Sequence, residues 1–319
     1  MTRNHPDVTL LAHNYVRPEV QDAADFVGDS LELARLATRT ETPYLVVAGV
    51  DFMAETAAIL NPDRTVLHPE PRSSCAMALR LSPADVLAAR TAHPDAAVVA
   101  YVNSSAAVKA VSDICCTSAN AVAVVNSLDE DEVIFVPDRN LAAYVAARTA
   151  KTVFPVPAIG CCPVHQALTP AEIRDARAAY PGAVVMVHPE TTPAVQDLAH
   201  FVGSTSAMLR RVQETDATTV IVGTDIAILH RMRKLAPNKI LVPASHLISC
   251  ADMRMITLDL VEEAVRIRAP VVRVDPAVAA GARRALERMF EVGADGPLPP
   301  RNGLRPRVTL RESLAEPIS

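Results

Sequence analysis

Three of the six cysteines in this 319-residue chain recur at an almost constant interval. Cys75 precedes Cys162 by 87 positions, and Cys162 precedes Cys250 by 88. Thiolate sulfur is a soft ligand that suits zinc and iron–sulfur clusters. Three thiolates from three separate segments can hold three irons of a [4Fe–4S] cluster and leave the fourth iron open to a substrate oxygen, as a Lewis acid. One such cluster per chain is our first hypothesis for these cysteines.

Two other interpretations of the cysteines stay open at this stage. Free cysteine is often buried, so all three could be small core residues. Zinc is the competing metal, with His165 as a fourth ligand three positions after Cys162. Neighbours on an extended segment point to opposite sides, so we expect Cys115, Cys116 and Cys161 to lie in the core or behind the site.

Side chains capable of acid–base chemistry recur with the same period, at the ends of apolar runs. The runs occupy residues 8–13, 97–102 and 184–188, and His13, Tyr101 and His188 lie at or near their ends. Each run is typical of a buried strand. Ligands of α/β proteins bind beyond the carboxyl ends of the strands, so these three residues are candidate site residues.

Two more landmarks complete a repeat of about 87 residues. A small hydroxyl residue opens a helical pattern at Ser30, Ser118 and Thr205. An aspartate follows a second strand at Asp51, Asp138 and Asp225, where we expect it to cap a helix. Alternating strands and helices imply parallel sheets with right-handed crossovers. We therefore predict an α/β fold of three repeated parallel-sheet units with pseudo-threefold symmetry around a central active site.

The repeat divides the chain into four parts. They are unit 1 (1–95), unit 2 (96–182), unit 3 (183–270) and a C-terminal segment (271–319). The C-terminal segment is expected to begin as a helix over 277–290. It is expected to end in a mobile tail that contains the Gly/Pro-rich residues 296–300.

Composition and charge argue against several functions. The net charge is −5 and aromatic residues make up 3% of the chain, so we expect no nucleic-acid binding. No run approaches the roughly 20 apolar residues of a membrane span. Residues 1–7 are polar and give no sign of a secretory signal. We therefore expect a cytoplasmic protein, with its cysteines reduced.

Taken in order, the motifs resemble those of the quinolinate synthase family. The similarity covers roughly residues 8–265. It rests on AHNY (12–15), RPEVQD (17–22), DFVGDS (25–30), FMAETA (52–57), YVN (101–103), TSANA (117–121), PDRNL (137–141), CPVH (162–165), VHPE (187–190), VGSTS (202–206) and CADM (250–253).

The resemblance implies an enzyme of NAD biosynthesis. Such enzymes condense iminoaspartate (iminosuccinate) with dihydroxyacetone phosphate to quinolinate, phosphate and water. It also implies three α/β units around one [4Fe–4S] cluster, with Cys75, Cys162 and Cys250 as the ligands. An aspartate-oxidising enzyme that supplies iminoaspartate is the partner this chemistry suggests.

Roles follow for individual residues. Glu190 is the candidate base for carbon-bound protons, and Tyr15 the candidate relay on the phosphate-bearing substrate. Tyr101 and His188 complete the predicted catalytic set. Because the substrates are anions, hydroxyls near helix N-termini are expected to bind them. The predicted substrate-binding residues are His13, Ser30, Tyr101, Asn103, Ser118, His165, His188, Glu190, Ser204 and Thr205.

Some positions depart from the usual pattern of the family. Asn14 replaces a frequent aromatic residue, Ser73 and Ser74 replace Ala-Gly, Thr191 replaces Cys, and Ala227 replaces Gly. These departures are compatible with the first of three alternatives that stay open. The alternatives are a paralogue with an altered substrate, a non-catalytic regulatory iron–sulfur protein, and a zinc hydrolase.

Overall fold

The computed structural model describes residues 5–292, and within them the chain forms three four-stranded sheets. Every strand pairing inside these sheets is parallel. Strand β1 (Val8–His13) is buried along its whole length, as expected for a parallel strand that is covered on both faces. The predicted α/β fold of three repeated parallel-sheet units is confirmed.

The three sheets share one strand order, with the first strand of each unit between the second and the third. The first sheet runs β2-β1-β3-β4, which are Phe26–Gly28, Val8–His13, Tyr44–Ala48 and Thr65–Leu67. The second runs β6-β5-β7-β8, which are Ile114–Cys116, Ala97–Tyr101, Glu132–Val136 and Thr152–Pro155. The third runs β10-β9-β11-β12, which are Phe201–Val202, Val184–Val187, Thr219–Gly223 and Ile240–Pro243.

Helices connect the strands of each sheet. Those around the first sheet are α1 (Pro18–Ala23), α2 (Ser30–Arg39) and α3 (Asp51–Leu60), followed by a 3₁₀ turn (Ala78–Arg80) and α4 (Pro83–Ala92). Then come α5 (Ala106–Ala110), α6 (Ala121–Asn126), α7 (Arg139–Ala146), α8 (Pro163–Gln166) and α9 (Pro170–Ala179). The third set is α10 (Pro193–Gln196), α11 (Thr205–Glu214), α12 (Ile228–Leu235), α13 (Ala251–Met255) and α14 (Leu258–Ile267).

After the third sheet the chain returns to the first. Helix α14 contacts α1 and β3, and Val271 forms an antiparallel bridge with Leu67 at the end of β4. The sequence pattern predicts a helix over 277–290, and α15 spans Pro276–Glu291. This helix packs closely on α5, since a Cβ added at Gly281 would lie 2.8 Å from the carbonyl oxygen of Ala110. The predicted mobile tail around 296–300 lies outside the described residues.

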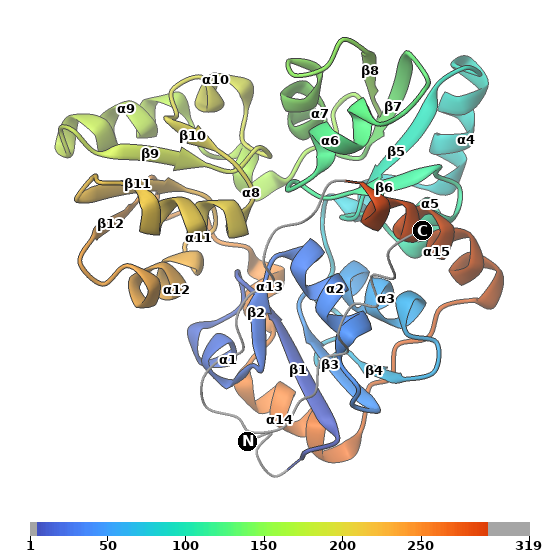
Figure 1. Cartoon of the computed structure of the whole chain (residues 1–319). Coiled ribbons are helices and arrows are strands. Elements are labelled where there is room, and N and C mark those ends of the chain that lie inside the picture. The colour runs from blue at the N-terminus through green and yellow to red at the C-terminus, as the bar shows by residue number, and fades with distance from the viewer. Residues whose placement is uncertain (1–4, 293–319) are drawn as a thin grey trace, which may run out of the picture.

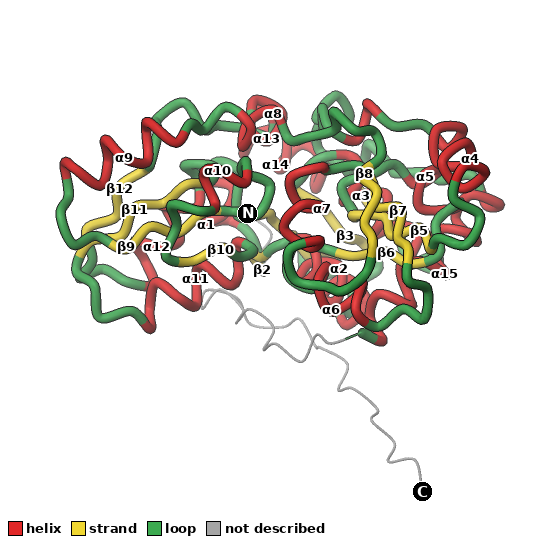
Figure 2. Tube along the Cα trace, turned by 90° about the horizontal axis from the view of Figure 1, so that it is seen from above, coloured by secondary structure: helices red, strands yellow, loops and turns green. Residues whose placement is uncertain are grey.

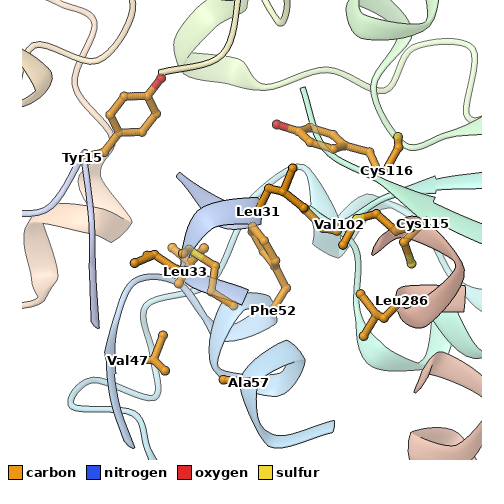
Figure 3. Packing of buried hydrophobic residues seen from close by; sticks show 14 of the residues in the cluster. Tyr15, Leu31, Leu33, Val47, Phe52, Ala57, Val102, Cys115, Cys116 and Leu286 are labelled. Carbon is orange, nitrogen blue, oxygen red and sulfur yellow. The ribbon is translucent and has the colours of Figure 1, made fainter. Parts of the chain in front are cut away.

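The three sheets surround a common centre. Figure 1 shows α8 and α13 near this centre, and the view from above in Figure 2 places these two short helices together. Away from the centre the units are filled by apolar side chains. Figure 3 shows Cys115 and Cys116 among such side chains, including Val102 and Leu286. Among residues 5–292, no helix has the length and apolar character that a bilayer crossing needs.

Candidate active site

A cavity of about 250 Å³ lies where the three units meet. All but one of the predicted site residues line it. They are His13, Tyr15, Ser30, Cys75, Tyr101, Asn103, Ser118, Cys162, His165, His188, Glu190, Thr205 and Cys250. The exception is Ser204, whose hydroxyl accepts a hydrogen bond from the Ala207 N–H and caps α11.

The three repeated cysteines occupy equivalent positions in loops around the cavity. In each unit the backbone N–H of the cysteine donates to an aspartate carboxylate that precedes it by 24 or 25 positions. The pairs are Cys75–Asp51 (3.4 Å), Cys162–Asp138 (3.2 Å) and Cys250–Asp225 (2.7 Å). The aspartates therefore hold the backbone that carries each thiol.

All three aspartates hold the backbone N–H of a cysteine, but they do not all cap a helix. Asp138 does cap α7, because its Oδ1 accepts from the first N–H groups of that helix. Asp51 is the first residue of α3 and is not its cap. Helix α12 begins only at Ile228, and Asp225 accepts the Ala227 N–H at 2.8 Å in the turn before it and forms an ion pair with Arg254 at 2.6 Å. The capping expectation was therefore correct in full only at Asp138.

The cavity cysteines suit a soft metal group. Burial raises the pKa of Cys75 to about 12 and that of Cys250 to about 11, and it also raises the pKa of Cys162. All three are thus neutral thiols at pH 7 that must lose protons when they ligate a metal. One sulfur from each unit at one cavity fits an iron–sulfur cluster with three protein ligands. Cys115, Cys116 and Cys161 are buried and are not among the cavity-lining residues.

Glu190 is the most connected polar residue of the cavity. Its Oε1 accepts a hydrogen bond from the Tyr101 hydroxyl at 2.8 Å, and a weaker one from the Asn103 side chain at 3.4 Å. Its Oε2 lies 2.7 Å from His165 Nδ1. Burial alone would raise the pKa of Glu190, but the neighbouring ring of His165 and the hydrogen bonds from His165 and Tyr101 outweigh burial and lower it to about 2. Glu190 is therefore ionised at neutral pH.

His13 and His188 share one hydrogen-bonding arrangement. In each, Nδ1 accepts the backbone N–H of the residue two positions later, Tyr15 at 3.1 Å and Glu190 at 3.3 Å. Burial lowers the pKa of His13 to about 4 and that of His188 to about 3, so both rings are neutral. A neutral ring that accepts at Nδ1 must carry its hydrogen on Nε2. For His188 this Nε2–H lies 3.1 Å from the hydroxyl of Ser118.

A chain of hydrogen bonds connects Tyr15 to Glu190 through a residue that the sequence analysis did not select. The hydroxyl of Thr224 bonds to the Tyr15 hydroxyl, and it lies 2.7 Å from His165 Nε2. The other ring nitrogen of His165 contacts Glu190. Burial raises the pKa values of Tyr15 and Tyr101 far above their usual range, so both keep their protons. Thr224 directly precedes the repeated Asp225, and that adjacency was the one available signal.

The hydroxyl residues differ in their relation to the helices. Ser30 and Thr205 are the first residues of α2 and α11, where free N–H groups and the helix dipole favour anions. Ser118 instead lies in the turn before α6, which begins at Ala121. This turn is closed by Asn120, whose side-chain oxygen accepts the Thr117 N–H at 2.7 Å. All three hydroxyl residues still line the cavity.

Known proteins resemble this chain over most of its length. Residues 1–291 match the family model described as "Quinolinate synthetase A protein". A curated relative from Methanoregula boonei, named quinolinate synthase, is 52% identical over 281 residues, which cover 88% of this chain and 92% of the relative. One of the same name from Pyrococcus furiosus is 49% identical over 283 residues, which cover 89% and 93%. The chain therefore belongs to the quinolinate synthase family of enzymes.

Proposed function

We propose that the chain is a quinolinate synthase that condenses iminoaspartate with dihydroxyacetone phosphate to quinolinate, phosphate and water. The observation that carries this proposal is the cavity itself. It combines one cysteine from each unit with Glu190, two tyrosines and neutral histidines. The family match and the names of the relatives support the same activity.

The proposed cofactor is one [4Fe–4S] cluster, which Cys75, Cys162 and Cys250 would hold. When bound, it supplies a Lewis acid through the one iron that lacks a protein ligand. His165 has a suitable place beside it, because its Nδ1 lies 3.2 Å from the sulfur of Cys162. The proposed role of His165 is to contact the phosphate group or the intermediate that loses water.

Proton removal from carbon is assigned to Glu190 together with His165. A base works best when its pKa lies near the working pH, and the pKa of Glu190, about 2, is well below that range. A substrate group that draws His165 away would raise the pKa of the carboxylate and make it a stronger base. We therefore assign the proton transfer to the pair, with Tyr101 and Asn103 orienting the carboxylate.

The chain from Tyr15 through Thr224 to His165 offers a second path for protons. Every member is buried, and each link is a hydrogen bond between groups that can both donate and accept. A proton that the Tyr15 hydroxyl gives to a substrate can therefore be replaced by one that moves along this chain from His165. We assign this path to the phosphate-bearing substrate, because that substrate must exchange protons between its carbon and oxygen atoms.

Anion binding is assigned to the residues that present hydrogens to the cavity. The Nε2–H groups of His13 and His188 suit carboxylate or carbonyl oxygens. Ser30 and Thr205 add hydroxyl groups at helix N-termini, and Ser118 adds one from the turn before α6. These donors come from all three units and can together bind the two carboxylates and one phosphate of the substrate pair.

A direct assay tests the proposed function. Protein purified without oxygen is expected to be brown, to contain about four irons per chain, and to form quinolinate from dihydroxyacetone phosphate and freshly generated iminoaspartate. Quinolinate and phosphate should appear in equal amounts. An iron-loaded protein that forms no quinolinate contradicts the proposed reaction and favours a paralogue or a regulatory protein.

One arrangement also favours a single metal ion. The ligand atoms of Cys162, His165 and Glu190 lie within 4.8 Å of one another, and this set of sulfur, nitrogen and oxygen suits zinc. A colourless protein with one tightly bound zinc and no iron would support the zinc hydrolase. The cytoplasmic location, the boundaries of the units, the absence of nucleic-acid binding and the aspartate-oxidising partner stay predictions.

A further inference from the structure

A buried amide next to the cavity connects the first unit to the third. Asn14 follows the cavity residue His13 and is fully buried. Its side-chain nitrogen Nδ2 lies 2.9 Å from the hydroxyl oxygen of Thr205, 191 positions later. Its side-chain oxygen Oδ1 lies 3.0 Å from Nη1 of Arg231. Asn14 does not itself line the cavity, whereas Thr205 does.

Arg231 determines which way this amide points. A guanidinium group has five N–H donors and no acceptor, so the atom of Asn14 that faces it must be the oxygen. Arg231 is itself fixed by a second hydrogen bond to the carbonyl oxygen of Val27. The NH₂ group of Asn14 therefore has to face Thr205.

The orientation of the amide determines whether the Thr205 hydroxyl donates or accepts in its hydrogen bond with Asn14. Because the NH₂ group can only donate, the hydroxyl oxygen of Thr205 must accept. The hydroxyl hydrogen is then free for another partner, and among residues 5–292 no acceptor bonds to it. Thr205 is 2% exposed, lines the cavity and starts α11. Its hydrogen is thus available to a ligand in the cavity.

We propose that Asn14 is a positioning residue which, held by Arg231, keeps the hydroxyl of Thr205 as a donor toward an anionic oxygen of the substrate. The inference rests on the proposed function, because that function supplies substrates with carboxylate and phosphate oxygens. Ligands that present an ionised oxygen at this point are favoured, and ligands that present an N–H or O–H group are disfavoured. Asn14 thereby contributes to specificity without touching the substrate.

The substitution Asn14→Asp tests this proposal with almost no change of shape. An ionised aspartate still pairs with Arg231, but it only accepts, so the Thr205 hydroxyl must turn its hydrogen toward residue 14. The lone pairs of the hydroxyl oxygen then face the cavity. A hydrogen bond to a charged group is lost, and quinolinate should bind to the cluster-loaded protein roughly ten-fold to a hundred-fold more weakly. KM should rise by a similar factor, with a smaller change in kcat.

A double-mutant cycle separates this effect from the added negative charge. In a Thr205→Val background there is no hydroxyl to turn, so Asn14→Asp should lower affinity only by the contribution of its charge. Thr205→Ser keeps the hydroxyl and should respond to Asn14→Asp as the wild type does. If Asn14→Asp has the same effect in the wild type and in the Thr205→Val background, the proposal is overturned.

A neighbouring residue supplies the control for general damage at the boundary between these units. The Ser206 hydroxyl donates to Glu32 of α2, and Ser206 does not line the cavity. Ser206→Ala should lower the melting temperature and leave anion affinity unchanged. Inorganic phosphate serves as a second probe, because its binding does not depend on which reaction the enzyme performs. A wild type that forms no quinolinate contradicts the proposed function alone, whereas unchanged affinity of Asn14→Asp for both anions contradicts the role of Asn14.

Discussion

Two sets of equivalent positions face the same cavity, and they have diverged to very different extents. The cysteine position is identical in the three units, as is the aspartate that holds its backbone N–H. At the strand ends, equivalent positions carry different pairs of residues. The pairs are His13 with Tyr15, Tyr101 with Asn103, and His188 with Glu190.

The difference matches what each set is proposed to bind, an iron–sulfur cluster for the cysteines and the substrates for the strand ends. A cluster with three protein ligands needs the same atom from each direction, so a threefold repeat can supply it without change. The proposed substrates have no such symmetry, and their proton transfers need an acid or base at particular points. The strand ends have therefore specialised. Units 1 and 3 keep a histidine with the same tautomer, and only unit 3 follows it with a carboxylate.

Replacing a repeated cysteine should have the largest effect, and an equal one in each unit. Cys75→Ser, Cys162→Ser and Cys250→Ser should each lower cluster content and reduce turnover by more than the roughly 100-fold associated with loss of an outer-shell partner. Iron analysis and the visible spectrum measure the first quantity, and quinolinate formation the second. Cys161→Ser is the control, because Cys161 does not line the cavity. If one of the three cysteines can be replaced without loss of iron, that cysteine is not a cluster ligand and the three positions are not functionally equivalent.

Replacing Glu190 should have the next largest effect on turnover. Replacing Tyr15 or Asn103, at the equivalent positions of units 1 and 2, should have a smaller effect. Glu190→Gln keeps the shape and removes the base, so kcat should fall by about 10²–10⁴. Iron content should stay at the wild-type level. Asn103→Ala, at the equivalent position of unit 2, should reduce kcat less, because Asn103 carries no base and its bond to Glu190 is long, at 3.4 Å. Full turnover by Glu190→Gln would show that another residue is the base.

Breaking the hydrogen-bond chain at Thr224 should have an intermediate effect. Thr224→Val has nearly the same shape but cannot bond to Tyr15 or His165. We expect kcat to fall by up to about 100-fold, the low end of what positioned acid–base groups contribute, with the spectrum of the proposed cluster unchanged. Thr224→Ser restores the hydroxyl and should recover most of the activity. Equal rates for the valine and serine variants would mean that the chain carries no proton.

The smallest expected effect is on stability, and it concerns Glu32, which belongs to neither set of equivalent positions. Burial, followed by the charge of Asp29, raises the pKa of Glu32 to about 7. The folded state therefore binds a proton more tightly than the unfolded state, and stability falls as pH rises from about 4.5 through 7. Glu32→Gln removes this dependence. Between pH 5 and pH 8 the free energy of unfolding of the wild type should fall relative to that of the variant. The fall should be up to about 1.4 kcal/mol for each unit by which the pKa of Glu32 in the folded state exceeds that in the unfolded state.

Glu172 provides the matched control, because it occupies the same capping-box position in α9 that Glu32 occupies in α2. Glu172 lies near the surface, where hydrogen bonds from Ser245 and Thr169 outweigh the effect of burial and lower its pKa. Wild type should therefore gain stability relative to Glu172→Gln as pH rises through the acidic range. Urea unfolding at several pH values measures both trends. Trends of the same sign would show that burial does not determine the titration of Glu32.

The sequence predicted those parts of the site whose positions are determined by contacts within a single unit. The strand β1 has the predicted bounds, and the strand-end residues face the cavity because a parallel strand fixes where its end points. The period of the repeat then selected the correct three of six cysteines for the cavity. These features depend on contacts within one unit, so a pattern of residues is enough to find them.

The residues that were missed depend on how the units pack against one another. Thr224 bonds to Tyr15 across 209 positions, and Asn14 bonds to Thr205 across 191. Neither threonine contact follows from periodicity, since the period describes each unit and says nothing about its neighbour. The constant interval between Asp51 and Cys75, and its equivalents, was visible. In the sequence the aspartate and the cysteine are two separate landmarks, because the loop that brings them together has no regular pattern.

The bond between Tyr15 and Thr224 also has a consequence for the making of the protein. Domains are synthesised at about 5–20 residues per second, so the tyrosine leaves the ribosome many seconds before its partner exists. The last cysteine of the cavity comes later still, at position 250. No shortened chain that ends before the third sheet can contain the complete pocket. No site for the proposed cluster and substrates is therefore complete until the chain has been translated beyond Cys250.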